Sequence, residues 1–79
     1  MDLQNLVEYI AKNLVDDPQQ VKVDMLESAN AITLELRVAP DDMGRVIGKG
    51  GKIANSIRTL VRVAAAREGK RVNLEIIDT

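Results

Sequence analysis

The chain has 79 residues, a formal net charge of −1, 46% hydrophobic residues and neither cysteine nor histidine. This length makes one domain, and the lack of cysteine excludes disulfides and thiolate metal sites. The longest apolar runs are too short to cross a bilayer, and the start lacks the basic segment of a secretory signal. We therefore expect one cytoplasmic domain over residues 1–79, without cofactor or metal.

The first part of the chain predicts one helix and two strands. Residues 2–15 place apolar side chains at helical spacing, and Asp2 is a suitable N-cap. Asp16-Asp17-Pro18 ends this helix, because the residue before a proline disfavours the α region. Residues 21–25 and 32–38 alternate between apolar and polar side chains, so each predicts a strand, with a turn at residues 28–30 between them.

The second part predicts two helices and a last strand. Pro40-Asp41-Asp42 opens a short helix that ends at Ile47, and a longer helix follows over residues 52–68. Gly69 occupies the position of a C′ glycine, and residues 72–76 alternate as a strand. The order helix, strand, strand, helix, helix, strand predicts a two-layer α+β domain, in which helices cover one face of an antiparallel or mixed three-stranded sheet.

The loop Gly48-Lys49-Gly50-Gly51 joins the two later helices. Glycine allows positive φ and a close approach of another backbone. The loop leads into a helix N-terminus, where unpaired amides and the helix dipole favour an anion, and Lys49 and Lys52 add positive charge. A nucleic-acid phosphate is therefore a natural ligand, although three glycines also fit a tight interhelical turn without a ligand. The spacing fits neither a Walker A loop nor a dinucleotide fingerprint.

Charge is distributed unevenly along the chain. Residues 1–44 carry nine acids against three bases, whereas residues 45–71 carry eight bases against one acid. Residues 72–79 add two more acids. Such a chain offers a basic face to a polyanion, although the same pattern also fits a solvated helix face.

The segment Val46-Ile47-Gly48-Lys49-Gly50-Gly51 resembles the VIGxxG signature of KH domains, whose GxxG loop clamps about four nucleotides of backbone. The element order resembles the type II KH arrangement, and the size resembles the small stand-alone bacterial KH proteins of the KhpA family. The resemblance implies single-stranded RNA binding, with RNA-chaperone activity. In place of the isoleucine that KH domains usually have three residues after the loop, this chain has Ala54. The residues that it assigns to RNA are Arg45, Val46, Ile47, Gly48, Lys49, Gly50, Gly51, Lys52 and Ile57.

In this scheme the bases lie across an apolar groove to which Val46, Ile47 and Ile57 contribute. The same three residues also fit plain core packing. Tyr9 is the only aromatic residue, so a reader that stacks bases on aromatic rings is a poor fit. A backbone clamp needs no aromatic side chains, and we therefore expect weak sequence selectivity.

Apolar residues of the long helix spread over roughly 200° of its circumference, at 100° per residue. A core-facing stripe is narrower, so the extra residues predict a partner surface, although alanines also occur simply as good helix formers. We assign Leu60, Val61, Val63 and Ala66 to this surface. The family resemblance implies homodimers, a complex with the larger KH protein KhpB (Jag or EloR), and roles in cell elongation and peptidoglycan homeostasis.

Catalysis is not expected from this composition. Histidine and cysteine are absent, and the carboxylate pairs Asp16-Asp17 and Asp41-Asp42 lie at helix boundaries, where capping explains them. No enzyme activity or small-molecule substrate is predicted. Two alternatives to RNA binding remain: a helix-turn-helix DNA-binding module over residues 41–68, and an interaction adaptor that kept the KH fold without binding RNA.

Overall fold

The structure is a computed structural model and describes residues 2–78. Its elements follow the predicted order of helix, strand, strand, helix, helix, strand. They are α1 (Leu3–Leu14), β1 (Lys22–Glu27), β2 (Ala31–Arg37), α2 (Met43–Ile47), α3 (Lys52–Ala66) and β3 (Arg71–Ile76), with single 3₁₀ turns at Pro18–Gln20, Pro40–Asp42 and Lys49–Gly51. No helix within the described residues has the length and apolarity needed to cross a membrane.

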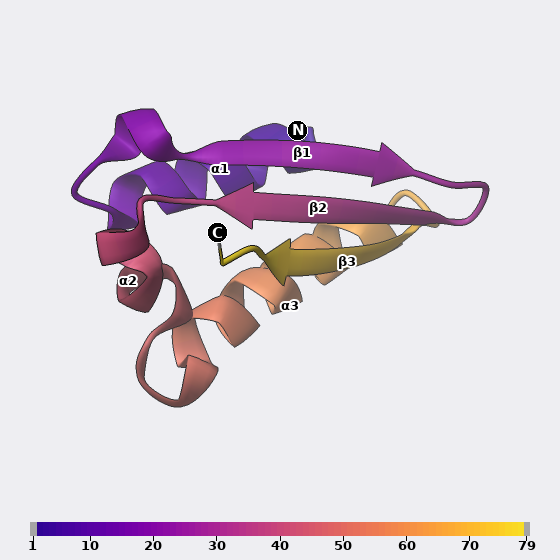
Figure 1. The fold of residues 1–79 in the computed structure, drawn as a ribbon. Helices are drawn as coiled ribbons and strands as arrows, with labels where there is room; N and C mark the ends of the chain where they lie inside the picture. Colours follow the sequence, from indigo (N-terminus) through magenta and orange to yellow (C-terminus); the bar gives the residue numbers. More distant parts are fainter. Residues whose placement is uncertain (1, 79) are drawn as a thin grey trace.

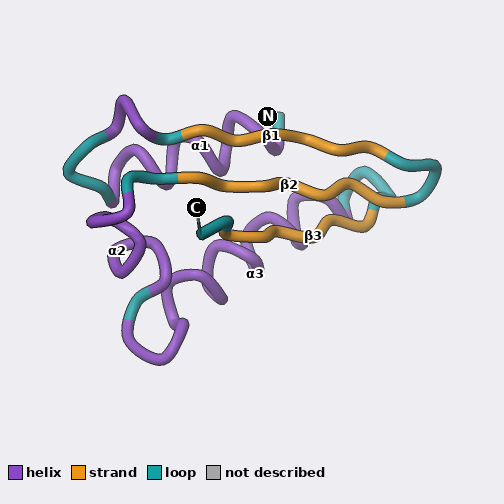
Figure 2. The backbone as a smooth tube through the Cα atoms, in the orientation of Figure 1, coloured by secondary structure: helices purple, strands orange, loops and turns teal. Residues whose placement is uncertain are grey.

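The three strands form one mixed sheet in the order β1-β2-β3. β1 and β2 are antiparallel, with Lys22 opposite Arg37, and are joined by the predicted turn. β2 and β3 are parallel, with Ala31 opposite Arg71, so the chain between them must cross over through α2 and α3. Figures 1 and 2 show the result: α1 and α3 lie on one side of the sheet, and the glycine loop is at the end of α3 away from the turn into β3.

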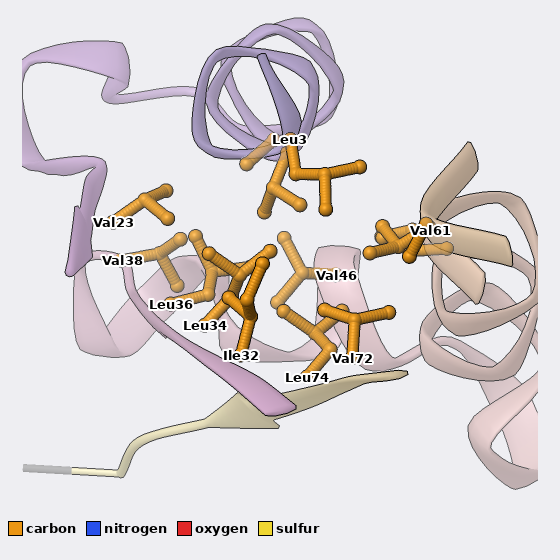
Figure 3. Packing of buried hydrophobic residues seen from close by; sticks show 14 residues of the cluster. Leu3, Val23, Ile32, Leu34, Leu36, Val38, Val46, Val61, Val72 and Leu74 are labelled. Carbon is orange, nitrogen blue, oxygen red and sulfur yellow. The ribbon is translucent and has the colours of Figure 1, made fainter. Parts of the chain in front are cut away.

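The core lies between the helices and one face of the sheet (Figure 3). Alternation in β2 buries every second residue, which confirms the predicted strand pattern. The opposite face of the sheet is largely polar, so the domain has two layers, as predicted. The buried cluster consists of Leu3, Val7, Ala11, Val23, Ile32, Leu34, Leu36, Val38, Val46, Ile57, Val61, Ala65, Val72 and Leu74.

Two helix ends follow the predicted capping chemistry. The Asp2 carboxylate accepts a hydrogen bond from the Gln4 amide at 2.8 Å, so Asp2 is the N-cap of α1. At the end of α3, Gly69 has φ +70°, and its amide donates to the Ala66 carbonyl at 3.0 Å. The Lys70 amide donates to the Ala65 carbonyl, also at 3.0 Å. This pair of bonds is a Schellman motif with Gly69 at C′.

The rotation of α3 about its axis decides which of its apolar residues are available to a partner. Its buried residues are Ala54, Ile57, Val61 and Ala65. The assignment of Val61 to a partner surface is therefore wrong, because the side chain is fully buried. Leu60 and Val63 are 55% and 52% exposed, and Ala66 is also exposed.

Candidate nucleic-acid interface

The backbone of the Gly48–Gly51 loop depends on positive φ at three positions. Gly48 has φ 76° and ψ 171°, a region that essentially only glycine occupies. Gly50 (φ 66°, ψ 17°) and Gly51 (φ 79°, ψ 12°) are left-handed. The sequence of conformations turns the chain from α2 into α3 within four residues, so the glycines are required by the turn itself.

The three glycines differ in what surrounds them. A Cβ on Gly48 would lie 2.6 Å from Ile53 Cγ1, so the packing of Ile53 against the loop excludes any side chain there. A Cβ on Gly50 would meet nothing within 4 Å, and one on Gly51 only Asn55 Nδ2 at 3.9 Å. Gly48 therefore closes the loop against α3, whereas Gly50 presents bare backbone to the outside.

The loop amides form a narrower anion site than the sequence predicts. The Gly48 amide donates to the Gly44 carbonyl at 2.9 Å, the Gly51 amide to the Gly48 carbonyl at 3.1 Å, and the Lys52 amide to the Lys49 carbonyl. Among the described residues, the Lys49 and Gly50 amides take part in no such bond. An anion that approaches the loop therefore finds two adjacent free donors, at the position where the chain lacks side-chain cover.

Positive charge at the loop comes from lysine and less from arginine. Lys49 and Lys52 are exposed, and neither forms an ion pair with another described residue. Arg45, which the sequence also assigns to RNA, instead binds Asp16 at 2.9 Å and Asp42 at 3.3 Å. Its guanidinium is held at the base of α2, so the structure favours a positioning role for Arg45.

Asp42 holds the start of α2 to a distant part of the chain. Its carboxylate oxygens accept hydrogen bonds from the Asp16 and Asp17 amides, each at 3.1 Å, and Asp42 is only 2% exposed. The sequence predicts Asp42 as a helix-end residue, but its carboxylate makes no cap within its own helix. It ties the segment after α1 to the helix that ends in the glycine loop, and so fixes the direction from which α2 enters the loop.

Two of the three residues assigned to the predicted apolar groove lie in the core, and only Ile47 stays available to it. Val46 is fully buried and Ile57 is 3% exposed, and both belong to the core cluster. Their assignment as groove-lining residues is therefore wrong for this structure, and plain core packing accounts for them. Ile47 is partly buried against the same cluster, as is Ile53, which covers Gly48.

Arg58 is a polar feature that the sequence reasoning missed. Its Nε donates to the Leu74 carbonyl at 3.1 Å, and its Nη1 donates to Asn55 Oδ1 at the same distance. Arg58 therefore bridges α3 to the edge strand β3, one turn after Asn55, which faces Gly51. The spacing of Arg58 and Arg62 on one side of α3 could have drawn attention to it, but its partner is a backbone carbonyl, which no sequence pattern predicts.

Within residues 2–78 no group of three or more acidic, histidine or cysteine side chains is placed to hold a metal.

These features define a class of domain. A three-stranded mixed sheet of α-β-β-α-α-β order, covered on one face by helices, with a GxxG loop between the last two helices, is a KH domain of type II. The family model of the KhpA/KhpB KH domain matches residues 4–76, and the chain belongs to this family. Membership does not support the helix-turn-helix alternative, in which further helices usually surround the helix pair.

Curated relatives match along almost their whole length. The "RNA-binding protein KhpA" of Clostridium acetobutylicum is 53% identical over 75 residues, covering 95% of this chain and 100% of the relative. The protein of the same name from Caldanaerobacter subterraneus is 57% identical over 72 residues, with coverages of 91% and 96%. That from Mycobacterium tuberculosis is 41% identical over 73 residues, with coverages of 92% and 88%.

A solved structure supports the fold independently of close sequence similarity. The crystal structure of Era in complex with MgGDPNP and nucleotides 1506–1542 of 16S ribosomal RNA superposes with a TM-score of 0.69. The match covers 94% of this chain and 28% of the Era chain, at 22% identity. At that identity the likeness shows a shared fold.

Proposed function

We propose that this chain is an RNA-binding protein that holds the backbone of single-stranded RNA at the Gly48–Gly51 loop with low sequence selectivity. The observation that carries the proposal is the backbone at Lys49 and Gly50. Within residues 2–78 neither amide donates a hydrogen bond, and the space where a side chain of residue 50 would lie is open. Lys49 and Lys52 add charge to these donors. Relatives at 41–57% identity are named RNA-binding protein KhpA, which favours RNA as the anion.

Low selectivity follows from what the site contains. Tyr9 is the only aromatic residue of the chain, and it lies on α1, outside the loop and the helices that flank it. Specific single-strand readers stack bases on aromatic side chains or hydrogen-bond the base edges. Amides and lysines hold phosphate, which is the same in every nucleotide.

The double substitution Lys49→Asp with Gly50→Asp tests the loop. Asp is one of the few side chains that tolerate the left-handed conformation of Gly50, and the space there is open, so the domain should stay folded. We expect the affinity for a fluorescent oligouridylate to fall below detection in an anisotropy titration, because two carboxylates replace the charge and block the amides. Circular dichroism checks the fold.

A control with the same change in charge is Lys22→Asp with Asn5→Asp, at exposed positions in β1 and in α1. This control should keep its affinity within about twofold at moderate salt, because distant exposed charges are screened over about 10 Å. Equal losses in the two variants would show that net charge alone governs binding. Unchanged affinity in the loop variant would refute the proposed site.

We further propose that α3 carries a partner surface formed by Leu60, Val63 and Ala66, and that a second copy of the chain occupies it. Leu60 and Val63 are two of the five large hydrophobic side chains, among those described, that are more than a third exposed. One loop with two free amides binds weakly, and joining two such loops raises avidity without new contacts at either one.

Self-association should appear as a concentration-dependent mass in sedimentation equilibrium. Leu60→Lys should shift the protein to monomer, whereas Leu26→Lys is a matched control, since Leu26 is 56% exposed on β1. A monomeric wild type at the highest concentration, or equal effects of the two variants, would contradict the proposal. If self-association is contradicted in this way, the surface would instead bind a larger KhpB-type KH protein.

The cellular setting follows from the family alone and belongs to the same proposal. We place the protein in the cytoplasm as an RNA chaperone without enzyme activity, connected through a KhpB-type partner to cell elongation and peptidoglycan homeostasis. Crosslinking in cells followed by recovery of RNA, with wild type and the loop variant side by side, separates an RNA-binding protein from an adaptor that has only kept the fold. Recovery at background level from both proteins would favour the adaptor, whereas equal recovery above background would show that RNA binds away from the loop.

A further inference from the structure

A basic hollow lies at the other end of α3 from the glycine loop. It has a volume of about 300 Å³ and is lined by Arg62 of α3, by Lys70 just before β3, and by Arg71, Val72 and Asn73 of β3. The three basic residues are exposed, and within the described chain none of them forms an ion pair. The lining of this hollow holds three cations and no acidic residue, which favours an anionic ligand.

Lys70 contributes less positive charge to an anion in the hollow than the two arginines do. Lys70 also borders a neighbouring hollow whose lining includes Glu27 and Glu68, so its ammonium has acidic groups nearby. Arg62 and Arg71 line the basic hollow and neither of the two neighbouring hollows that Lys70 also borders. Arginine presents a planar fork of donors that suits phosphate oxygens, and these two residues therefore carry the argument.

The hollow is connected to the loop by the side of α3 that faces β3. Asn55, Arg58 and Arg62 follow one another at spacings of three and four residues, which places them on one side of the helix. Asn55 faces Gly51, and Arg58 is fixed between Asn55 and the Leu74 carbonyl. These side chains form a polar and basic track from the loop to the hollow. Figure 1 shows the backbone that carries it, with α3 running beside the edge strand β3.

The length of this track matches a short run of nucleotides. Arg62 lies ten residues after Lys52, which is about 15 Å along a helix. Stacked nucleotides are spaced about 3.4 Å apart on a strand, so this distance corresponds to roughly four nucleotides. We propose that an RNA strand seated on the loop continues along α3, and that Arg62 and Arg71 bind one of its phosphates in the basic hollow.

This inference rests on the proposed function, since the strand must first be held at the loop. It makes the site longer than a single clamp, and it gives a length requirement. An RNA of four nucleotides fills the loop alone, whereas one of about ten nucleotides reaches both ends of α3. Only the longer RNA should be sensitive to the arginines.

The test compares Arg62→Gln/Arg71→Gln with the control Lys12→Gln/Lys22→Gln, which removes the same charge at exposed positions on α1 and β1. With a decauridylate in an anisotropy titration, the first variant should bind about tenfold more weakly, the effect of removing one charge-assisted hydrogen bond. The control should change by less than about twofold, since it touches no phosphate. Circular dichroism checks that both variants are folded.

Three further measurements distinguish a phosphate bound by the arginines from general electrostatic attraction to positive charge. The slope of log affinity against log salt should become shallower by about 0.7 for each phosphate that the variant no longer binds. Binding of a tetrauridylate, followed by NMR shifts of the Lys49 and Gly50 amides, should be unchanged. Arg62→Lys/Arg71→Lys keeps the charge without the fork and should lie between wild type and the glutamine variant.

Equal losses in the arginine variant and its control, or equal losses for short and long RNA, would overturn the second phosphate site. That outcome leaves the loop assignment intact, provided that Lys49→Asp/Gly50→Asp still abolishes binding. Conversely, RNA binding that survives the loop variant removes the proposed function itself. Failure of the second phosphate site is therefore detected with the arginine variant, and failure of the proposed function with the loop variant.

Discussion

Replacing Gly48 by alanine should destabilise the domain more than any other single methyl addition in the loop. The backbone at Gly48 lies in a region that costs a residue with a side chain about 1–3 kcal/mol. The new Cβ would also lie 2.9 Å from Ile53 Cδ1 and 3.0 Å from Ile53 Cβ. A rotamer change cannot move Cβ, so the first turn of α3 must shift, and overpacking of this kind costs about 1–3 kcal/mol.

The two effects together amount to about 2–6 kcal/mol. Single domains are stable by about 5–15 kcal/mol, and a 79-residue chain belongs near the lower limit. Each kcal/mol lowers Tm by about 4–8 °C in a domain of this size. Urea denaturation followed by circular dichroism measures the free energy of unfolding, and we expect the midpoint to fall steeply.

Gly50→Ala is the matched control for this effect. Gly50 has a left-handed backbone with nothing within 4 Å of a new Cβ, so only the backbone cost of about 1–2 kcal/mol applies. A loss of less than about 1 kcal/mol for Gly48→Ala, or equal losses at the two positions, would refute the reasoning. It would mean that the loop relaxes around Ile53 instead of being closed by it.

Three further substitutions test other contacts. Asp42→Ala removes the acceptor of the Asp16 and Asp17 amides and a partner of Arg45, and should cost about 2–4 kcal/mol in urea denaturation; a loss under about 1 kcal/mol would contradict the tether. Asp2→Ala removes the N-cap of α1 and should cost about 1 kcal/mol, seen as a lower Tm, whereas an unchanged Tm would count against the cap. Gly44→Ala should instead stabilise the domain by about 0.5–1 kcal/mol, because Gly44 is helical and a methyl group there meets nothing; a lower urea midpoint would argue against this.

The fold was predictable because its signals are local. The strand pattern of residues 32–38, the stop at Pro18 and the C′ glycine at position 69 each depend on neighbours a few residues away, and each has its counterpart in the structure. The glycine loop was visible for the same reason.

The site was less predictable because its details depend on distant contacts. Apolar residues cover so much of α3 that the sequence did not show which part faces the sheet, and Val61 rather than Leu60 is buried. The Asp42 carboxylate binds amides 25 and 26 residues earlier in the chain, and this pairing holds Arg45 as well. The periodicity of a sequence does not predict contacts between residues so far apart in the chain.

The parallel pairing of β2 with β3 has a consequence for synthesis of the chain. Ala31 pairs with Arg71, so the partner of the central strand emerges from the ribosome forty residues after it. Until then α3 lacks the strand to which Arg58 binds, although the glycine loop has already been made. A nascent chain should therefore contain the glycine loop before the complete sheet exists to hold α3 in place. We expect it to bind RNA only after β3 has been synthesised.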